Sequence, residues 1–428
     1  MSRFHNFIGG LIAKRNLILY LLILISELAL IRSASDIKPE TQNWVEKAQQ
    51  ILHLHIPVDN FYGPGAAIMM IPFSLVSGTA YLANFIYLGL GSIAYWKLSE
   101  SIYNSKLRAL VLLALPTNFY LLWLINSSQD TVFEFCLLMW GGFFLVNKRF
   151  GFFATLAFIL CETRSGYWVF FLGISIFYFA KEYFKNKKFV WRKLIAVYLL
   201  VLTSLFNFIN YDSTSPALEG GVTAYFSYTK YHYLALPKMD MDVFLSGPQG
   251  AFSSKYGPDI PPGSTPAQVN SIYQHAAIDS AFTNKKETLL GWMQKFDSYI
   301  FDVQKVPHLP GAYVLNQTDM TIKIVDERLS WQLVLGNLLY EIYRTVLLSF
   351  GLLAVGILLA SWFFGDGRFK RDLKLLGLAA PFIFGIVPGL LIYTETRFKV
   401  VSELLLVPFI AEIWSLAMAY RANRETKA

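Results

Sequence analysis

Two acidic side chains, Asp36 and Glu40, follow the first apolar run of the sequence at a spacing of four residues. A carboxylate in such a place can act as a general base that removes the proton of an attacking acceptor hydroxyl. The alternative is structural, because acids near a helix N-terminus satisfy free N–H groups and suit the helix dipole. Asp36 and Glu40 are therefore candidate catalytic residues, and either one can be the base.

Arg164 lies in the sequence CETRSGYW, between two apolar runs. An arginine near the middle of a membrane costs roughly 2.5 kcal/mol or more, so it needs an anion or a water-filled cavity. The guanidinium fork matches the geometry of a phosphate group, which makes Arg164 a candidate ligand of a lipid phosphate. The alternative is an ion pair with Glu162 in a tight turn.

Arg397 and Lys399 are a second basic pair, in the sequence YTETRFKVVSELLLVP near the end of the chain. By the same argument they are candidate donor-phosphate ligands from the far end of the sequence. The alternative is that they are ordinary basic anchors at a membrane interface.

Three further polar residues, Asp59, Tyr62 and Asp130, are expected to line the cavity or contact the acceptor. Asp130 and Glu134 lie at the start of an apolar run, in INSSQDTVFEF. Ser128 or Asp130 as a helix N-cap is the structural alternative.

The elements that must position these residues follow from composition. Of the 428 residues, 55% are hydrophobic and only 15% are charged, and apolar runs recur along most of the chain. Single runs approach the roughly 20 residues that cross a bilayer as a helix. The sequence therefore predicts an all-α polytopic membrane protein with about ten transmembrane helices. The two cysteines, Cys136 and Cys161, stand inside apolar runs and show no metal-ligand spacing with histidine.

The predicted spans follow one another with short connections, except for one long polar region. They are Leu17–Arg32, Tyr81–Leu98, Leu107–Ile125, Thr131–Val146, Gly151–Thr163, Gly166–Ala180, Leu194–Asn210, Leu338–Phe364, Leu375–Tyr393 and Val400–Tyr420. Pro64–Val76 is short and broken by Pro72, which predicts an interfacial or half-inserted helix.

With the N-terminus inside, most lysines and arginines fall in inner loops, as the positive-inside rule demands. All candidate residues above then face the outer side of an inner (plasma) membrane. The outer loop of residues 33–62 carries an apolar stripe of Trp44, Ala48, Ile51 and Leu52. This helical spacing predicts a helix lying along the membrane surface.

Three regions are expected: an N-terminal transmembrane module (residues 1–210), an extracytoplasmic region (211–337) and the C-terminal transmembrane helices (338–428). The middle region begins with a Gly- and Pro-rich loop and becomes helical from Thr265. A second helix is expected over Lys286–Phe301. Its inward face is expected to be Leu289, Leu290, Met293 and Phe296.

The order of these motifs resembles the GT-C superfamily of integral-membrane glycosyltransferases, in particular the bacterial branch related to protein O-mannosyltransferases and the lipid A aminoarabinose transferase. Asp36 and Glu40 occupy the acidic position of the family's first outer loop, and FYGPGAAIMMIPF is similar to its proline-led surface helix. SSQDTVFEF, ETRSG and ETRFKVVSELLLVP resemble its later outer turns.

The resemblance implies an inverting glycosyltransferase that takes a sugar from a polyprenyl-phosphate donor at the outer face. The acceptor would be a lipid-linked glycan, lipopolysaccharide or protein. No metal, other cofactor or nucleic acid is expected. Two alternatives remain: a glycan ligase or polymerase that uses a lipid diphosphate, and a lipid or glycan transporter or flippase. Transporters often have matching interrupted helices in the two halves of the chain. This sequence shows no such match, which argues against a transporter.

Overall fold

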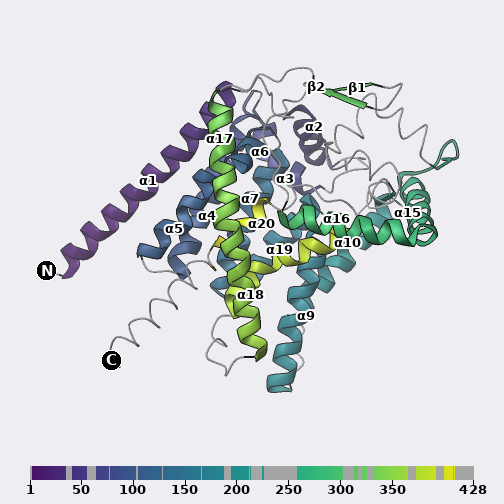
Figure 1. Ribbon diagram of the computed structural model, residues 1–428. Helices are drawn as coiled ribbons and strands as arrows, with labels where there is room; N and C mark the ends of the chain where they lie inside the picture. The colour runs from purple at the N-terminus through teal and green to yellow at the C-terminus, as the bar shows by residue number, and fades with distance from the viewer. Residues whose placement is uncertain are drawn as a thin grey trace.

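The computed structural model is mostly helical, as expected from the sequence (Figure 1). It describes residues 2–34, 41–54, 64–76, 78–102, 105–127, 129–164, 166–187, 194–211, 213, 224–225, 258–301, 313–316, 321–324, 331–364, 373–391, 400–407 and 409.

The elements are labelled as in Figure 1. The first half contains α1 (Ser2–Ala34), α2 (Thr41–Leu52), α3 (Gly65–Ser74), α4 (Leu82–Ile102), α5 (Ser105–Thr117), α6 (Phe119–Ser127), α7 (Gln129–Val146), α8 (Phe150–Thr163), α9 (Tyr167–Asn186) and α10 (Ile195–Tyr211). The second half contains α15 (Pro266–Thr283), α16 (Lys285–Phe301), β1 (Tyr313–Asn316), β2 (Thr321–Ile324), α17 (Trp331–Ile342), the π-helical segment η4 (Tyr343–Leu348), α18 (Ser349–Phe364), α19 (Leu373–Leu391) and α20 (Val400–Glu403).

Helix α7 forms the centre of the bundle, and its first three turns are buried on every side. A helix buried on every side belongs in the core, and in α7 the acids Asp130 and Glu134 are buried with the apolar residues. Helix α4 approaches it closely at Gly91, where an added Cβ would lie 2.5 Å from the Phe135 ring and 3.1 Å from the Cα of Cys136. Small residues permit such close approach between membrane helices. The residues of α7 are therefore held firmly in place.

The predicted span Leu107–Ile125 is wrong as a single helix, because α5 ends at Thr117 and α6 begins at Phe119. Pro116 brings no N–H to the helix, and the Asn118 side chain accepts the backbone N–H of Leu121 at 3.2 Å. Asn118 therefore caps a new helix.

Pro116 also leaves the carbonyl of Leu112 without its usual partner four residues on. The hydroxyl of Tyr20 on α1 donates to that carbonyl at 3.0 Å. Helix α1 packs on the bundle through a stripe of every fourth residue, Tyr20, Leu24 and Leu28, and its other side is exposed. This hydrogen bond and this apolar stripe attach the described part of the long helix to the bundle, and Arg32 lies over the ring of Tyr81 near its end.

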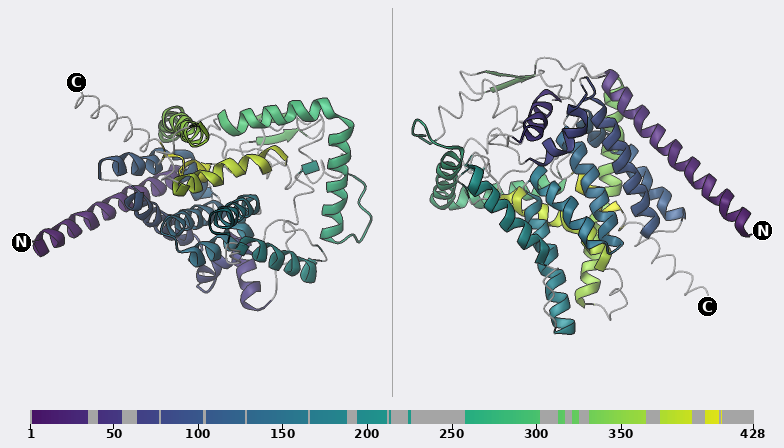
Figure 2. Two further views of the ribbon diagram at one scale, coloured as in Figure 1. Left: turned by 90° about the horizontal axis from the view of Figure 1, so that it is seen from below. Right: turned by 180° about the vertical axis from the view of Figure 1, so that it is seen from behind.

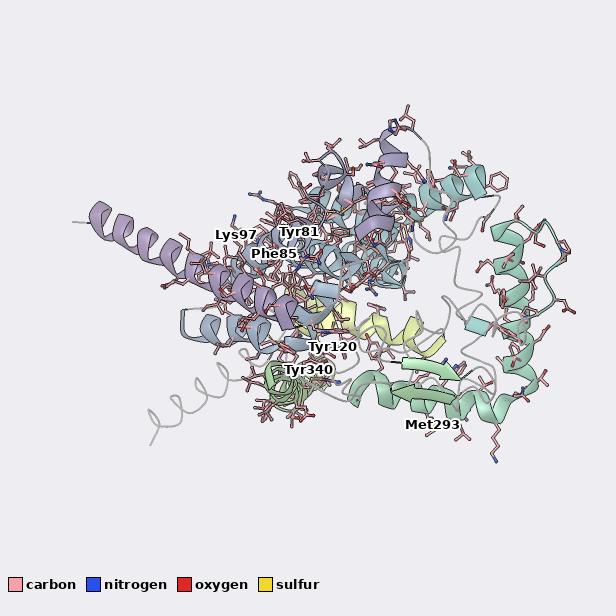
Figure 3. The ribbon with its side chains drawn as sticks, turned by 90° about the horizontal axis from the view of Figure 1, so that it is seen from above. Tyr81, Phe85, Lys97, Tyr120, Met293 and Tyr340 are labelled. Carbon is pink, nitrogen blue, oxygen red and sulfur yellow. The ribbon has the colours of Figure 1, made fainter. Side chains whose placement is uncertain are left out.

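The interrupted helix α17–η4–α18 runs along the length of the bundle (Figure 1). Gly336 admits the Phe119 ring so closely that any added Cβ would collide with it. Nearby, the rings of Tyr120 and Tyr340 lie with centroids 5.3 Å apart, as Figure 3 allows the reader to follow. Aromatic pairs at this distance stabilise a helix contact.

Helices α15 and α16 confirm the two helices expected in the middle region. Helix α15 begins with a capping box, in which Thr265 accepts the N–H of Gln268 and Gln268 accepts the N–H of Thr265. The expected inward face of α16 is wrong. Leu289 and Met293 are 58% and 63% exposed, whereas Lys295 and Tyr299 are buried.

The strands β1 and β2 pair antiparallel, Tyr313 opposite Ile324, and add a short hairpin that the sequence pattern did not predict. The helix expected around Trp44 is present as α2, in which Trp44 and Ala48 are buried within the protein and Leu52 is 43% exposed. Its place at a membrane surface remains a prediction.

Two described stretches have both the length and the apolar composition to cross a bilayer: Asn16–Ser33 in α1 and Leu338–Ile357 across α17, η4 and α18. Shorter apolar helices are Gly65–Ser74, Phe150–Thr163, Tyr167–Ile176, Val197–Asn210 and Leu378–Val387. The multi-pass topology remains a prediction.

Candidate functional site

Arg164 occupies the turn between α8 and α9, in extended backbone conformation with φ −144° and ψ 105°. Its N–H donates to the carbonyl of Leu160 at 2.8 Å, and its carbonyl accepts the N–H of Tyr167 at 3.1 Å. These two bonds end α8 and begin α9. They fix the direction in which the Arg164 side chain leaves the turn.

The guanidinium of Arg164 lies between two carboxylates of α7. Its Nη2 is 2.9 Å from Oδ2 of Asp130, and its Nε is 2.6 Å from Oε2 of Glu134. Nη2 also donates to Thr131 Oγ1 at 3.2 Å. The Arg164 side chain is only 9% exposed, and that of Glu134 is fully buried. The Nη2 contact with Asp130 is a charge-assisted hydrogen bond, whereas the Nε contact with Glu134 is a close ion pair without hydrogen-bond geometry.

Neighbouring side chains hold these acids in place. Tyr167 donates its hydroxyl to Oε1 of Glu134 at 2.5 Å. The Oδ1 of Asp130 accepts the N–H of Thr131 at 2.9 Å, which suits an acid in the first turn of a helix. Glu162, the acid nearest to Arg164 in sequence, instead accepts the hydroxyl of Thr203 on α10 at 2.8 Å.

Helix α3 supports the turn from outside. A Cβ added at Gly65 would lie 2.5 Å from each of three atoms of α8: the carbonyl oxygen of Ile159 and the backbone nitrogen and hydroxyl of Thr163. Gly65 belongs to the FYGPGAAIMMIPF motif, and Thr163 immediately precedes Arg164. The tight contact thus places α3 directly against the backbone that carries the arginine.

A second pair of opposite charges is buried between η4 and α20. Nη2 of Arg344 is 4.0 Å from Oε1 of Glu403, and the two side chains are 3% and 0% exposed. Within the part of the chain that the structure describes, neither carboxylate oxygen of Glu403 has a hydrogen-bond partner. A π-helical turn such as η4 is frequently found at functional sites.

Tyr299 of α16 connects the two pairs. Its hydroxyl donates to the carbonyl of Phe382 on α19 at 3.0 Å and hydrogen-bonds with Ser402, next to Glu403. Electrostatically, the Tyr299 hydroxyl interacts with both Glu134 and Glu403. We call the two ion pairs, with Tyr167 and Tyr299, the charged centre; its acidic and basic members are Asp130, Glu134, Arg164, Arg344 and Glu403.

Lys295 lies one turn before Tyr299 on the same face of α16, and its amine donates to the carbonyl of Leu390 at 3.2 Å. The C-terminal carbonyls of a helix such as α19 favour a cation. Burial nevertheless lowers the pKa of Lys295 from 10.5 to about 7. Lys295 is therefore a cation whose charge is readily lost near neutral pH.

Of the predicted site residues, the structure brings together Arg164 and Asp130. The sequence left open an ion pair of Arg164 with Glu162, and Arg164 instead pairs with acids of α7. It also left open Asp130 as an N-cap, but α7 begins at Gln129, so Asp130 lies inside the first turn. The other predicted site residues lie outside the described part of the chain: Asp36, Glu40, Asp59, Tyr62, Arg397 and Lys399.

Sequence reasoning gave Arg344, Glu403, Tyr167 and Tyr299 no role. A signal existed for Arg344 and Glu403, since each is an ionisable residue inside an apolar run, and such residues are functional candidates by default. No comparable signal marks the two tyrosines, because aromatic residues are common throughout the chain.

Among the described residues, no group of three or more His, Cys, Asp or Glu side chains could hold a metal ion. The sequence matches no model of a known protein family, and it has no significant match among curated proteins.

Proposed function

We propose that the protein is an inverting glycosyltransferase of the inner or plasma membrane, which moves a sugar from a polyprenyl-phosphate donor to an acceptor at the outer face. The acceptor class is a lipid-linked glycan, lipopolysaccharide or protein. The observation that carries the proposal is the charged centre, a set of buried arginines, carboxylates and tyrosines inside an apolar helical bundle.

A multi-pass location in the membrane is supported by the exposed surface of the helices. On α10 the side chains of Val201, Leu205, Phe208 and Ile209 are each more than half exposed. Helix α1 exposes Ile18 and its apolar neighbours in the same way. Apolar patches of this extent mark a membrane or protein contact, whereas a water-soluble surface rarely carries them.

Two buried arginines suit a substrate with a phosphate. In the proposed reaction, the bond between the sugar and the phosphate oxygen breaks, and the polyprenyl phosphate leaves with increased negative charge. Fixed cations near that oxygen stabilise the transition state. An arginine fork also recognises phosphate geometry in two parallel hydrogen bonds.

Arg164 already binds two carboxylates, so a phosphate must take the place of one of them. Asp130 is the candidate for exchange, because its side chain is 10% exposed whereas that of Glu134 is fully buried. In this proposal Glu134, held by Tyr167, keeps the guanidinium in position while the phosphate replaces Asp130.

The remaining roles rest on the family resemblance. Asp36 or Glu40 takes the proton from the acceptor hydroxyl as the new sugar–oxygen bond forms. Arg397 and Lys399 add positive charge beside the donor phosphate, and Asp59 and Tyr62 line the acceptor side of the cavity.

A transporter is the second candidate, and the charged centre itself is the observation that favours it. Chains of buried acids inside membrane helices also serve as proton relays in pumps and transporters. A transporter would move its substrate without releasing polyprenyl phosphate.

The test uses purified protein in lipid, a panel of polyprenyl-phosphate sugars, an acceptor extract and the measurement of polyprenyl phosphate released. The proposal predicts release from one donor, strong reduction by Arg164→Lys, and loss in either Asp36→Asn or Glu40→Gln. Arg149→Lys, an exposed arginine in the α7–α8 turn, is the matched control and should not change the rate. Absence of release from every monophosphate donor would overturn the proposal in favour of a diphosphate-using ligase or a transporter.

A further inference from the structure

On α16 the polar side chains face the bundle and the large apolar side chains are exposed, which is the reverse of the usual arrangement. The side that contacts the bundle carries Thr288, Lys295 and Tyr299, all at least nine-tenths buried. The opposite side carries large apolar residues with exposed fractions of 46–63%: Leu289 58%, Leu290 49%, Met293 63% and Phe296 46%. A helix beside water is expected to show the opposite arrangement.

Helix α15 continues the same surface. Ile278 and Phe282, one turn apart at its end, are 45% and 70% exposed. The apolar surface therefore runs around the turn from α15 into α16. We name it the α15–α16 apolar surface: Ile278, Phe282, Leu289, Leu290, Met293 and Phe296.

The inner side of α16 is anchored to an apolar helix. Lys295 donates to the carbonyl of Leu390, and Tyr299 donates to that of Phe382, so α16 follows more than two turns of α19. Gly385, between these contacts, lies so close to the Tyr299 hydroxyl that a Cβ would collide with it. The sequence of α19, LKLLGLAAPFIFGIVPGLL, contains no charged residue after Lys374. Helix α16 is therefore fixed beside a segment suited to the membrane interior.

Helices α15 and α16 lie crosswise to α17 and α18 (Figure 2), as expected of helices that lie in the plane of a membrane. Seen from below in Figure 2, α15 and α16 are viewed along their sides, whereas α17 and α18 are viewed nearly along their axes. Figure 3 labels Met293 on α16 at the outer edge of the molecule. Exposed Lys285 and Lys286 stand at the first turn of α16, where they can meet anionic lipid headgroups.

We propose that the α15–α16 apolar surface is seated in the outer leaflet of the bilayer, at the boundary between headgroups and acyl chains. An in-plane helix with one apolar and one polar face inserts in this way. The polar face of α16 then closes the charged centre from the side, and its apolar face contacts lipid. The middle region is thus partly embedded in the membrane, which differs from an entirely extracytoplasmic cover.

The test is independent of catalysis. Single cysteines at Met293, Phe282 and Asp279 are introduced into the full chain, with Cys136 and Cys161 replaced by alanine, and are labelled with an environment-sensitive fluorophore. Asp279 is the matched control, an exposed charged residue on α15 one turn before Phe282. The proteins are reconstituted into vesicles of phosphatidylcholine and phosphatidylglycerol, and quenching by brominated lipids and by iodide is measured.

The proposal predicts quenching by brominated lipids at positions 293 and 282 that exceeds quenching at position 279 by about threefold or more, with the reverse order for iodide. Strong iodide quenching at 293 and 282 would overturn it by showing contact with water. Protection from both quenchers would also overturn it, because another part of the chain or a second copy would then cover the surface.

Discussion

The two ion pairs of the charged centre differ in how completely they are formed. Arg164 has oxygens of Asp130 and Glu134 at 2.9 and 2.6 Å, and Tyr167 holds Glu134 from the other side. Arg344 and Glu403 are equally buried but stand 4.0 Å apart, and neither Glu403 oxygen has a hydrogen-bond partner among the described residues.

This difference separates two tasks. A buried pair with short contacts and several hydrogen bonds fixes its neighbours, whereas a buried carboxylate without hydrogen-bond donors lowers the stability of the fold. We therefore expect Arg164, Glu134 and Tyr167 to hold α7 against the α8–α9 turn, also while a phosphate replaces Asp130. The Arg344 pair is expected to rearrange more readily when a ligand enters, with the hydroxyl of Tyr299 between the two.

The largest effect is expected from Arg164→Met. Removal of the guanidinium leaves two carboxylates buried without their cation, which should lower the free energy of unfolding by about 3–5 kcal/mol. Unfolding in mild detergent measures this loss, with Arg149→Met as the exposed control. A loss no greater than that of the control would contradict the distinction between the two pairs.

Lys295 is a third buried basic residue beside Arg164 and Arg344, and it makes the free energy of unfolding depend on pH. Its pKa falls from 10.5 to about 7 on burial, so between these values the unfolded chain binds more protons than the folded chain. The free energy of unfolding should therefore rise with pH from about 7 to 10, by about 3 kcal/mol, and stay flat in this respect below pH 7.

Lys295→Met should remove this slope and raise stability at pH 7. Unfolding of the native and variant proteins across pH 6–10 checks the expectation. Parallel pH profiles for the two proteins would show that the amine keeps its ordinary pKa in the folded state.

The backbone support of the Arg164 pair is tested at Gly65. Gly65→Ala drives a Cβ into backbone atoms of α8, and overpacking of this kind costs about 1–3 kcal/mol. Gly89→Ala on α4 is the matched control, because nothing lies within 4 Å of the added Cβ. Thermal unfolding of both variants should separate them clearly. Equal behaviour would mean that α3 does not constrain the arginine turn.

The smallest effect is expected at the second pair. Glu403→Gln keeps the shape and still offers an oxygen to Arg344 across the 4.0 Å gap, so the loss of stability should be about 1 kcal/mol, below the roughly 3–5 kcal/mol of removing one partner of a close buried pair. The same substitution at Glu134 serves as the comparison and should cost several times more. A loss at Glu403 as large as that at Glu134 would show that the 4.0 Å pair is as strong as the 2.6 Å pair.

The positions of the helices were largely predictable from the sequence, whereas the side of each helix that is buried was not. Apolar runs mark helices because burial and backbone hydrogen bonding favour them in any apolar surrounding. The break at Asn118 follows from local chemistry: Pro116 lacks an N–H, and the Asn118 side chain accepts the N–H of Leu121. For α16 the assumption of an apolar inward face failed, because Lys295 and Tyr299 on that face donate hydrogen bonds to carbonyls of α19 and the large apolar side chains are exposed.

The candidate site was predictable in part. Arg164 was recognisable because a charge between apolar runs needs an explanation, but its partners come from α7, more than thirty residues earlier in the sequence. Local spacing offered Glu162 as the alternative partner, and the structure joins Glu162 to Thr203 instead. Such pairings follow from helix packing, and single-sequence patterns contain little information about it.

The central claim, that the charged centre receives the donor phosphate, is tested most directly by binding. We would measure the affinity of a labelled polyprenyl phosphate and of the corresponding uncharged polyprenol for the protein in lipid nanodiscs. The account predicts that the phosphate binds about tenfold tighter or more, that Arg164→Lys weakens it, and that Asp130→Asn strengthens it by removing the competing carboxylate. Equal affinity for the phosphate and the alcohol, or weaker binding by Asp130→Asn, would contradict the account.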